Sequence, residues 1–282
     1  MLGGGNLLQN QTSNRSLLYY GLLTRVAHFF GARCILFSAG VGELYGKWAR
    51  GFAERTLSLC ELASFRTQND LRKLPSGAKE NVIASDLGFL YSPNISPLQN
   101  VGEKYFVVAL REPKTDRASF VQSLSYSINK ISMDTNLKPF FVTMHPEKDE
   151  KISKEMASRC KGATLYSRID SDEFLKILRG AQFSIGMRLH STVMSVKNCI
   201  PHICIPYDTK CYDFMAHIVE FATKNSIETK NFLHTSAPNT LYVDLKKMAF
   251  LQHDRQGYES LSKALTKDAH KFKFYLEKLL SM

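Results

Sequence analysis

The stretch QFSIGMRLHSTVMSVKNCIPHICIPYD, from Gln182 to Asp208, decides the fold of this chain. It predicts a buried strand, a helix and a second buried strand, because two short apolar runs flank a longer segment with helical spacing. Gly186 lets the chain turn between the first strand and the helix, and Arg188 and His190 follow that turn. Since a buried charge without a partner costs several kcal/mol or more, we expect an anion or a reaction beside these two residues.

The same alternation of short β-rich runs and longer helical patterns extends over the rest of the chain. It is typical of a doubly wound α/β fold, and its order fits two Rossmann-like halves with a cleft between them. The best linker candidate is YSPNISPLQNVGEK, residues 91–104, which is rich in Pro, Asn and Ser. We therefore expect an N-terminal Rossmann-like domain over residues 1–95 and a C-terminal one over 96–235. Residues 236–282 are expected to form a C-terminal segment. Within it, a last strand at TLYVDL, residues 240–245, is expected before a closing helix.

The composition is that of a soluble globular protein, with 44% hydrophobic and 22% charged residues among 282. The six cysteines show no C-x-x-C pair and no metal-ligand spacing with histidine, which favours a reduced, cytoplasmic setting. No stretch reaches the roughly 20 apolar residues of a membrane span, and the N-terminus has no signal-peptide pattern.

The formal net charge of +11 points toward anionic partners in general. Nucleic acid is not expected, because the basic residues are spread out and form no recognised nucleic-acid module. The last twenty residues carry five lysines against two acids in a helical pattern. This pattern favours a solvated face, with a weak peripheral contact to a membrane surface as the alternative. The oligomeric state is not predicted.

Cationic side chains are predicted at one rim of the second half. Ligands of open α/β folds bind outside the carboxyl ends of the strands, and Arg188 and His190 lie at such a strand end and in the first turn of a helix. The free amides of that turn favour an anion, an arginine offers a planar fork for carboxylate or phosphate, and a histidine can donate a proton near neutral pH. Adjacent strand ends contribute Arg111, His145, and Asp208 with Lys210, so a cationic pocket is expected.

The corresponding rim of the first half carries glycines and polar residues: Gly3, Gly4, Gly5, Asn6, Gln9, Thr12, Gly40, Gly42, Arg66 and Asp86. Such glycines let backbone amides approach a ligand closely. The chain opens on MLGGGNLLQ, so this loop is expected to have no strand before it. Arg66 and Arg111, each taken singly, are expected to bond a loop rather than a ligand, and His202 is expected to be satisfied within the core.

Several motifs together carry a family resemblance: GGGNLLQNQTSNRSLLYYGLL, FSAGVGEL, MHPEKD, IGMRLHSTVMSVKNCIPHICIPYDTK and CYDF. Over residues 3 to 221 the chain resembles the polysaccharide pyruvyl transferase family, CsaB-like branch. The resemblance implies a GT-B-like fold of two Rossmann-like domains. It also implies transfer of an enolpyruvyl-derived group from phosphoenolpyruvate to a sugar of a lipid-linked or polymeric cell-surface glycan, with a pyruvate ketal and phosphate as products. The acceptor in this branch is typically an N-acetylmannosamine residue.

The resemblance also implies roles for the rim residues. His190 is expected to act as general acid, and Arg188 and Lys210 to hold the anionic groups of the donor. The remaining substrate-binding residues are expected to be Arg66, Arg111, Asp208, Gly4, Gly5, Asn6 and Gln9. Neither a metal nor a cofactor is required by this scheme, in which phosphoenolpyruvate is the donor substrate.

The chain departs from the family pattern at several positions. Family members usually begin with a strand and a GN-x-GD loop well before the GGG block, so the first domain is expected to lack about two or three βα units of roughly 30 residues each. Glu43 replaces a proline, Thr67 replaces an aspartate after Arg66, and Asn10 replaces an acidic residue. Two alternatives therefore stay open: a GT-B glycosyltransferase with a nucleotide-sugar donor, and a truncated relative without catalytic activity.

Overall fold

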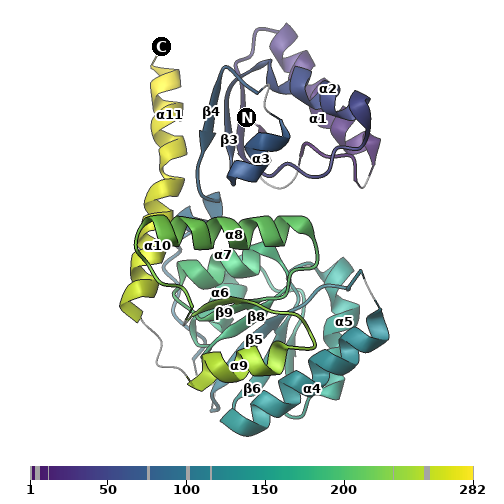
Figure 1. The fold of residues 1–282 in the computed structure, drawn as a ribbon, viewed down its shortest axis with the longest axis vertical. Coiled ribbons are helices and arrows are strands. Elements are labelled where there is room, and N and C mark those ends of the chain that lie inside the picture. Colours follow the sequence, from purple (N-terminus) through teal and green to yellow (C-terminus); the bar gives the residue numbers. More distant parts are fainter. Residues whose placement is uncertain are drawn as a thin grey trace. The chain divides into compact units, whose positions relative to one another are not determined.

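The computed structural model divides the chain into two compact units (Figure 1). Unit 1 contains Met1–Tyr91 and Ala264–Met282, and unit 2 contains Ser92–Lys263. The structure describes residues 2–3, 7–11, 13–74, 77–99, 102–114, 116–230, 232–250 and 255–281. The segment 236–282, expected as a separate part, is thus divided between the units. None of the described helices is long and apolar enough to cross a membrane.

Unit 2 contains a parallel sheet in the order β10-β9-β8-β5-β6-β7. Its strands are β5 Tyr105–Ala109, β6 Lys138–Val142, β7 Thr164–Tyr166, β8 Ser184–Gly186, β9 His202–Cys204 and β10 Leu233–Thr235. The order is the doubly wound Rossmann order, in which the chain starts in the middle and winds outward in both directions. Its topological switch point lies between β5 and β8, so a ligand crevice is expected at the carboxyl ends of those two strands.

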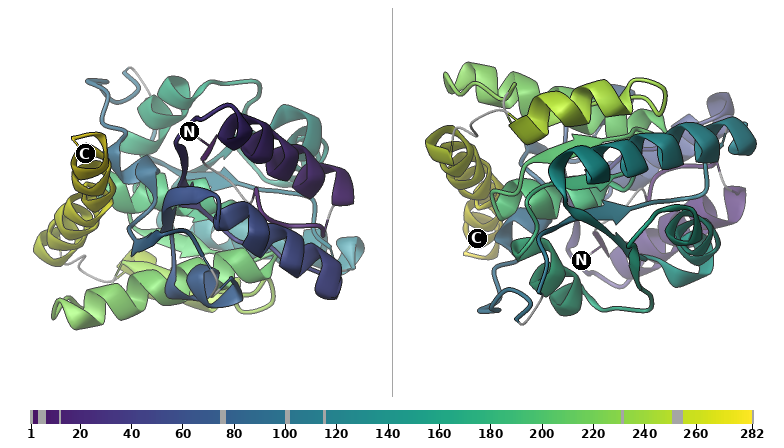
Figure 2. Two further views of the ribbon diagram at one scale, coloured as in Figure 1. Left: turned by 90° about the horizontal axis from the view of Figure 1, so that it is seen from above. Right: turned by 90° about the horizontal axis from the view of Figure 1, so that it is seen from below.

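Helices cover both faces of this sheet (Figure 2). They are α4 Arg117–Thr135, α5 Pro146–Arg159, α6 Ser171–Arg179, α7 Leu189–Lys197, α8 Thr209–Lys224 and α9 Leu241–Phe250. Alternate residues of β5 serve the two faces: Phe106 and Val108 pack in a core with α4, α5 and α9, whereas Tyr105 and Val107 pack in a core with α6. Because both faces are buried, β5 reads as a continuous apolar run.

The predicted strand over residues 240–245 is wrong, because this segment begins α9. Leu241, Leu245 and Met248 are all fully buried, and their spacing of four and three residues places them on one side of a helix. The last strand of the sheet is instead β10, which pairs with β9. α10, Arg255–Ala269, then continues from unit 2 into unit 1.

Unit 1 contains a parallel sheet in the order β1-β2-β3-β4. Its elements are β1 Leu2–Gly3, α1 Asn14–Phe29, β2 Cys34–Ala39, α2 Gly46–Leu57, β3 Cys60–Phe65, α3 Gln68–Lys73, β4 Glu80–Ile83 and the 3₁₀ turn η1 Leu87–Leu90. The expectation that no strand precedes the glycine-rich loop is wrong, since Leu2 and Gly3 pair with β2 in parallel register.

The C-terminal helix α11, Lys271–Leu280, belongs to unit 1. Phe272 stacks on Phe37 with ring centroids 5.5 Å apart, and Arg33 donates a hydrogen bond to the carbonyl of Leu279 at 2.6 Å. The Asp268 carboxylate accepts hydrogen bonds from the amide and the hydroxyl of Ser85, both at 2.8 Å. The last residues of the chain therefore complete the core of the sheet formed by the first.

Candidate active site

The turn between β8 and α7 places Arg188 and His190 as the sequence predicts. Arg188 is the N-cap residue of α7, and His190 follows in its first turn with an exposed side chain. Gly186 allows this turn because a Cβ there would lie 2.0 Å from the Ser191 hydroxyl oxygen and 2.9 Å from Cε1 of His202. Only a residue without a side chain lets the helix begin so close to the strand.

A buried polar network holds α7 against β8 and β9. The imidazole of His202 bonds the hydroxyl of Ser184 through Nδ1 at 2.8 Å and that of Thr192 through Nε2 at 3.0 Å. Ser195 joins the network through the Ser184 hydroxyl at 2.8 Å. Complete burial lowers the pKa of His202 to about 3, so its imidazole is neutral. The prediction that His202 is satisfied within the core is confirmed, and it supports the helix that carries His190.

The anion that Arg188 meets in the structure is Asp149 of α5. Nε of Arg188 donates to one carboxylate oxygen at 2.6 Å and Nη2 to the other at 2.5 Å. Asp149 is fully buried and also accepts a hydrogen bond from the amide of His145 at 3.0 Å. Such a two-pronged pair fixes the guanidinium plane and offsets its charge, and Nη1 makes neither of these bonds. The sequence signal for this partner is the MHPEKD motif, which contains Asp149.

Three cations surround Tyr207, which follows β9. Nη1 of Arg111 donates a hydrogen bond to the Tyr207 hydroxyl at 2.6 Å, and the guanidinium carbon lies 4.3 Å from the ring centroid. The ammonium nitrogens of Lys210 and Lys114 lie 5.3 Å and 5.6 Å from the same centroid. We refer to Arg111, Lys114 and Lys210 as the cation cluster. The sequence predicted two of its members but not Lys114, although Lys114 lies only three residues after Arg111.

Burial, reinforced by the nearby charge of Asp208, raises the pKa of Tyr207 above its ordinary value. Its phenol therefore stays protonated and supplies no negative charge to the cluster. Asp208 is the N-cap of α8, where its carboxylate accepts the amide of Cys211 at 3.2 Å. The same carboxylate lies 3.4 Å from the ammonium of Lys210. The structure thus gives Asp208, predicted to bind substrate, a role as helix cap and counter-charge of Lys210.

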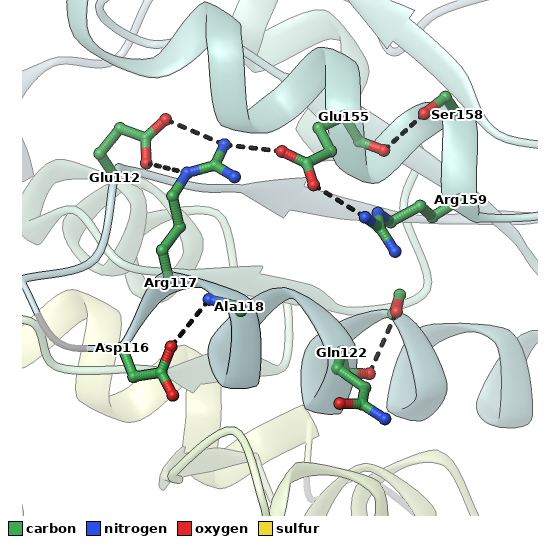
Figure 3. Close-up of polar contacts among 9 residues, drawn as sticks. Glu112, Asp116, Arg117, Ala118, Gln122, Glu155, Ser158 and Arg159 are labelled. Atoms are coloured by element: carbon green, nitrogen blue, oxygen red, sulfur yellow. Dashed lines mark hydrogen bonds and ion pairs between the residues drawn. The ribbon is translucent and has the colours of Figure 1, made fainter.

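An ion-pair network fixes the loop between β5 and α4 (Figure 3). Arg117 donates to both carboxylate oxygens of Glu112, at 3.0 and 3.4 Å, and contacts Glu155 of α5 at 2.7 Å. Glu155 in turn pairs with Arg159 at 3.1 Å. Because Glu112 directly follows Arg111 in the chain, the network anchors the loop that supplies two members of the cation cluster.

In unit 1, the structure supports the expectation that Arg66 bonds a loop of the protein rather than a ligand. Its guanidinium lies 3.0 Å from the carboxylate of Asp86, and the two side chains are only 5% and 7% exposed. Thr67, which replaces the family's aspartate, caps α3 by accepting the amide of Asp70. Arg66 therefore finds its carboxylate twenty positions later rather than at the next residue.

The glycine-rich first-domain rim is described only in part. Of the predicted residues, Gly4, Gly5, Asn6 and Thr12 lie outside the described residues. Gln9 is half-buried and follows Leu8, which forms a parallel bridge with Val41 after β2. The segment from Leu8 to Asn10 therefore runs beside the glycine-containing loop after β2. Asn10, at the position of the family's acidic residue, bonds the backbone of Tyr45 through both ends of its amide at 2.7 and 3.1 Å.

No cluster of three or more His, Cys, Asp or Glu that could hold a metal occurs in the part of the chain that the structure describes. The motifs can be compared with those of known families: a sequence profile described as "Polysaccharide pyruvyl transferase" matches residues 1–209.

The chain belongs to the polysaccharide pyruvyl transferase family.

As a member of this family the chain is a transferase enzyme. Its Arg188 and His190 motif and its Tyr207 motif both lie within the matched region. Among curated protein sequences, none matches the chain.

Solved structures with the same fold include sugar-nucleotide enzymes and glycosyltransferases. A structure of Staphylococcus aureus MnaA with UDP is 13% identical over 94% of this chain and 80% of that one, with a TM-score of 0.59. A UDP-GlcNAc 2-epimerase of Methanocaldococcus jannaschii is 13% identical over 92% and 74%, with a TM-score of 0.53. A trehalose-6-phosphate synthase, OtsA, is 8% identical over 95% and 77%, with a TM-score of 0.56. At these identities the likeness shows the fold alone, which is α/β and GT-B-like with Rossmann-like sheets.

Proposed function

We propose that this pyruvyl transferase uses phosphoenolpyruvate as donor and a sugar of a cell-surface polysaccharide as acceptor. The observation that carries the proposal is the cationic rim of unit 2, where Arg188, His190 and the cation cluster follow strands β5, β8 and β9. Phosphoenolpyruvate carries a carboxylate and a phosphate, which need several cations and free helix amides. The rim lies at the switch point of the sheet, where such folds bind ligands.

The transfer is a ketal formation. His190 donates a proton to the methylene carbon of the donor, which makes the central carbon electrophilic. One sugar hydroxyl adds to that carbon, and a second hydroxyl displaces the phosphate. The products are a pyruvate ketal with a methyl group and inorganic phosphate. Of the two hydroxyl protons, one replaces the proton that His190 gave to the methyl group, and the other is taken up by the departing phosphate. In this scheme the exposed position of His190 in the first turn of α7 leaves room for a substrate beside it.

The experiment supplies phosphoenolpyruvate and an acceptor polysaccharide in D₂O and measures released phosphate together with the ketal product. The proposal predicts one deuterium in the ketal methyl group, because the added proton comes from an exchangeable group. His190→Gln should abolish phosphate release, whereas His270→Gln, a change of another exposed histidine, should not. Release by His190→Gln at the unchanged rate would remove His190 as the acid.

A nucleotide-sugar donor is the second candidate. The cation cluster could equally face a diphosphate, and the similar structures from S. aureus and M. jannaschii are complexes that contain UDP. Turnover with a nucleotide sugar and none with phosphoenolpyruvate would favour this second candidate.

A further inference from the structure

The cation cluster carries more positive charge than its protein surroundings offset. Lys210 has the carboxylate of Asp208 as a counter-charge at 3.4 Å. Arg111 bonds a neutral phenol, and neither Arg111 nor Lys114 pairs with a carboxylate among the described residues. Three cations with one carboxylate leave an excess of two positive charges around a single ring.

Around Arg188, in contrast, the positive charge is offset by a negative one. Its charge is offset by the buried carboxylate of Asp149, through two of its N–H groups. What this side of the site offers is the remaining Nη1 of Arg188 together with the positive end of the α7 dipole, which has no side-chain cap from Arg188. The two parts of the site adjoin, because the amide of Arg111 lies 3.4 Å from the sulfur of Met187, the residue before Arg188.

The phosphate and the carboxylate of the proposed donor differ in charge, as the cation cluster and the Arg188 side of the site do. A phosphate monoester carries nearly two negative charges at neutral pH, since its second pKa is about 6, whereas a carboxylate carries one. We propose that the cation cluster binds the phosphate of the donor and that Lys114 is a further phosphate-binding residue. The carboxylate then lies on the side of Arg188 and α7. This assignment rests on the proposed function.

The structure also explains how Lys114 reaches its place. Its side chain is exposed and its neighbour Glu112 is held by Arg117, which is held in turn by Glu155 (Figure 3). The loop is thus anchored on one side, while Lys114 makes no ion pair with any residue that the structure describes and can turn its ammonium toward an incoming anion. A lysine acts on phosphate as a flexible point charge, which suits this arrangement.

The test compares two small probes that each represent one half of the donor, inorganic phosphate and pyruvate, by calorimetric titration of the full chain. Lys114→Met should weaken phosphate binding about tenfold or more, as expected for one hydrogen bond between charged groups. It should leave pyruvate binding unchanged within about twofold, and Lys114→Arg should restore most of the phosphate affinity. Lys161→Met is the matched control, because this exposed lysine lies between α5 and β7, before the amino end of that strand, whereas the cation cluster follows the carboxyl ends of β5 and β9.

Equal phosphate affinity of Lys114→Met and the wild type would overturn the assignment, as would absence of phosphate binding by the wild type. A loss of pyruvate binding as large as that of phosphate would also overturn it. The proposed function fails separately: if phosphoenolpyruvate is not turned over, a selective loss of phosphate binding in Lys114→Met still supports the phosphate subsite. Conversely, if turnover of phosphoenolpyruvate depends on His190 while Lys114→Met leaves the KM for phosphoenolpyruvate unchanged, that result would contradict the phosphate assignment and would still support the proposed function.

Discussion

The pair formed by Arg188 and Asp149 should separate stability from activity in a double-mutant cycle. Asp149 is fully buried, and the side chain of Arg188 is 17% exposed. Removing one partner of such a pair leaves an uncompensated charge, which typically costs about 3–5 kcal/mol. Replacing both partners by apolar side chains of similar size is often neutral. We therefore expect each single change to be costly and the double change to recover most of the loss.

The difference in exposure between the two side chains predicts which single variant loses more stability. Arg188→Met leaves the fully buried carboxylate of Asp149 without its cation. Among the described residues it then keeps the amide of His145 as its one hydrogen-bond partner, so the free energy of unfolding should fall by about 3–5 kcal/mol. Asp149→Leu leaves a guanidinium that water can still reach, so its cost should be about 2–3 kcal/mol. The double variant should lie within about 1 kcal/mol of the wild type, which gives a coupling free energy of about 4 kcal/mol or more.

The assay is urea unfolding followed by far-ultraviolet circular dichroism, with tryptophan fluorescence as an internal control. Trp48 is the only tryptophan of the chain and lies in α2 of unit 1. A change confined to unit 2 should shift the circular dichroism transition more than the fluorescence transition. Turnover is then measured on the double variant, which should be folded but inactive because Arg188 is gone.

Two results would refute this reasoning. If each single variant cost less than about 1 kcal/mol and the double variant cost their sum, the pair would not be the coupled, desolvated contact that its burial implies. If the double variant released phosphate at the wild-type rate, Arg188 would have no part in the reaction.

Three further outcomes are expected from the second unit. Because the pKa of His202 is about 3 in the folded chain against 6.5 ordinarily, only the unfolded state takes up this proton as the pH falls from 6.5 to 3. The free energy of unfolding should therefore drop by about 1.4 kcal/mol per pH unit, or about 2 kcal/mol at pH 5. His202→Gln should flatten this slope. If NMR showed that the His202 imidazole of the folded chain titrates near pH 6.5, this expectation would be wrong. Gly186→Ala should cost about 1–3 kcal/mol by crowding the start of α7, whereas Gly102→Ala, where a Cβ meets nothing within 4 Å, should unfold at nearly the wild-type urea concentration. Tyr207→Phe removes the hydroxyl that accepts from Arg111 but keeps the ring, so KM for the donor should rise several-fold with little change in melting temperature; an unchanged KM would mean that this bond does not orient the guanidinium.

Much of the fold was predictable because its signals are local. The alternation of apolar strands and longer helical runs identified the doubly wound sheet of unit 2, and the turn at Gly186 placed Arg188 and His190 correctly at a strand end. The family resemblance also rested on local motifs, and the profile match to residues 1–209 confirms it. The strands that precede Lys210, His190, Arg111 and His145 are predicted to be neighbours, and the order β9-β8-β5-β6 confirms this.

The errors of prediction came from segments whose pattern fits two structures. Residues 240–245 are rich in β-formers, but burial of Leu241 and Leu245 on one face made them helical. Leu2 and Gly3 are too short a run to predict as a strand, and only pairing with β2 makes them one. In both cases tertiary contacts outweighed local preference.

The sequence by itself determined which residues reach the carboxyl ends of the strands, because that depends on the order of short apolar runs and turns along the chain. Only the tertiary structure decided which of those charges stay available. It paired Arg66 with Asp86 and Arg188 with Asp149, and it placed Lys114 beside Tyr207 with no carboxylate partner among the described residues. The physical reason is that the partners in each of these two ion pairs lie about twenty or forty positions apart in the chain. Their approach is set by how strands and helices pack and not by any local pattern.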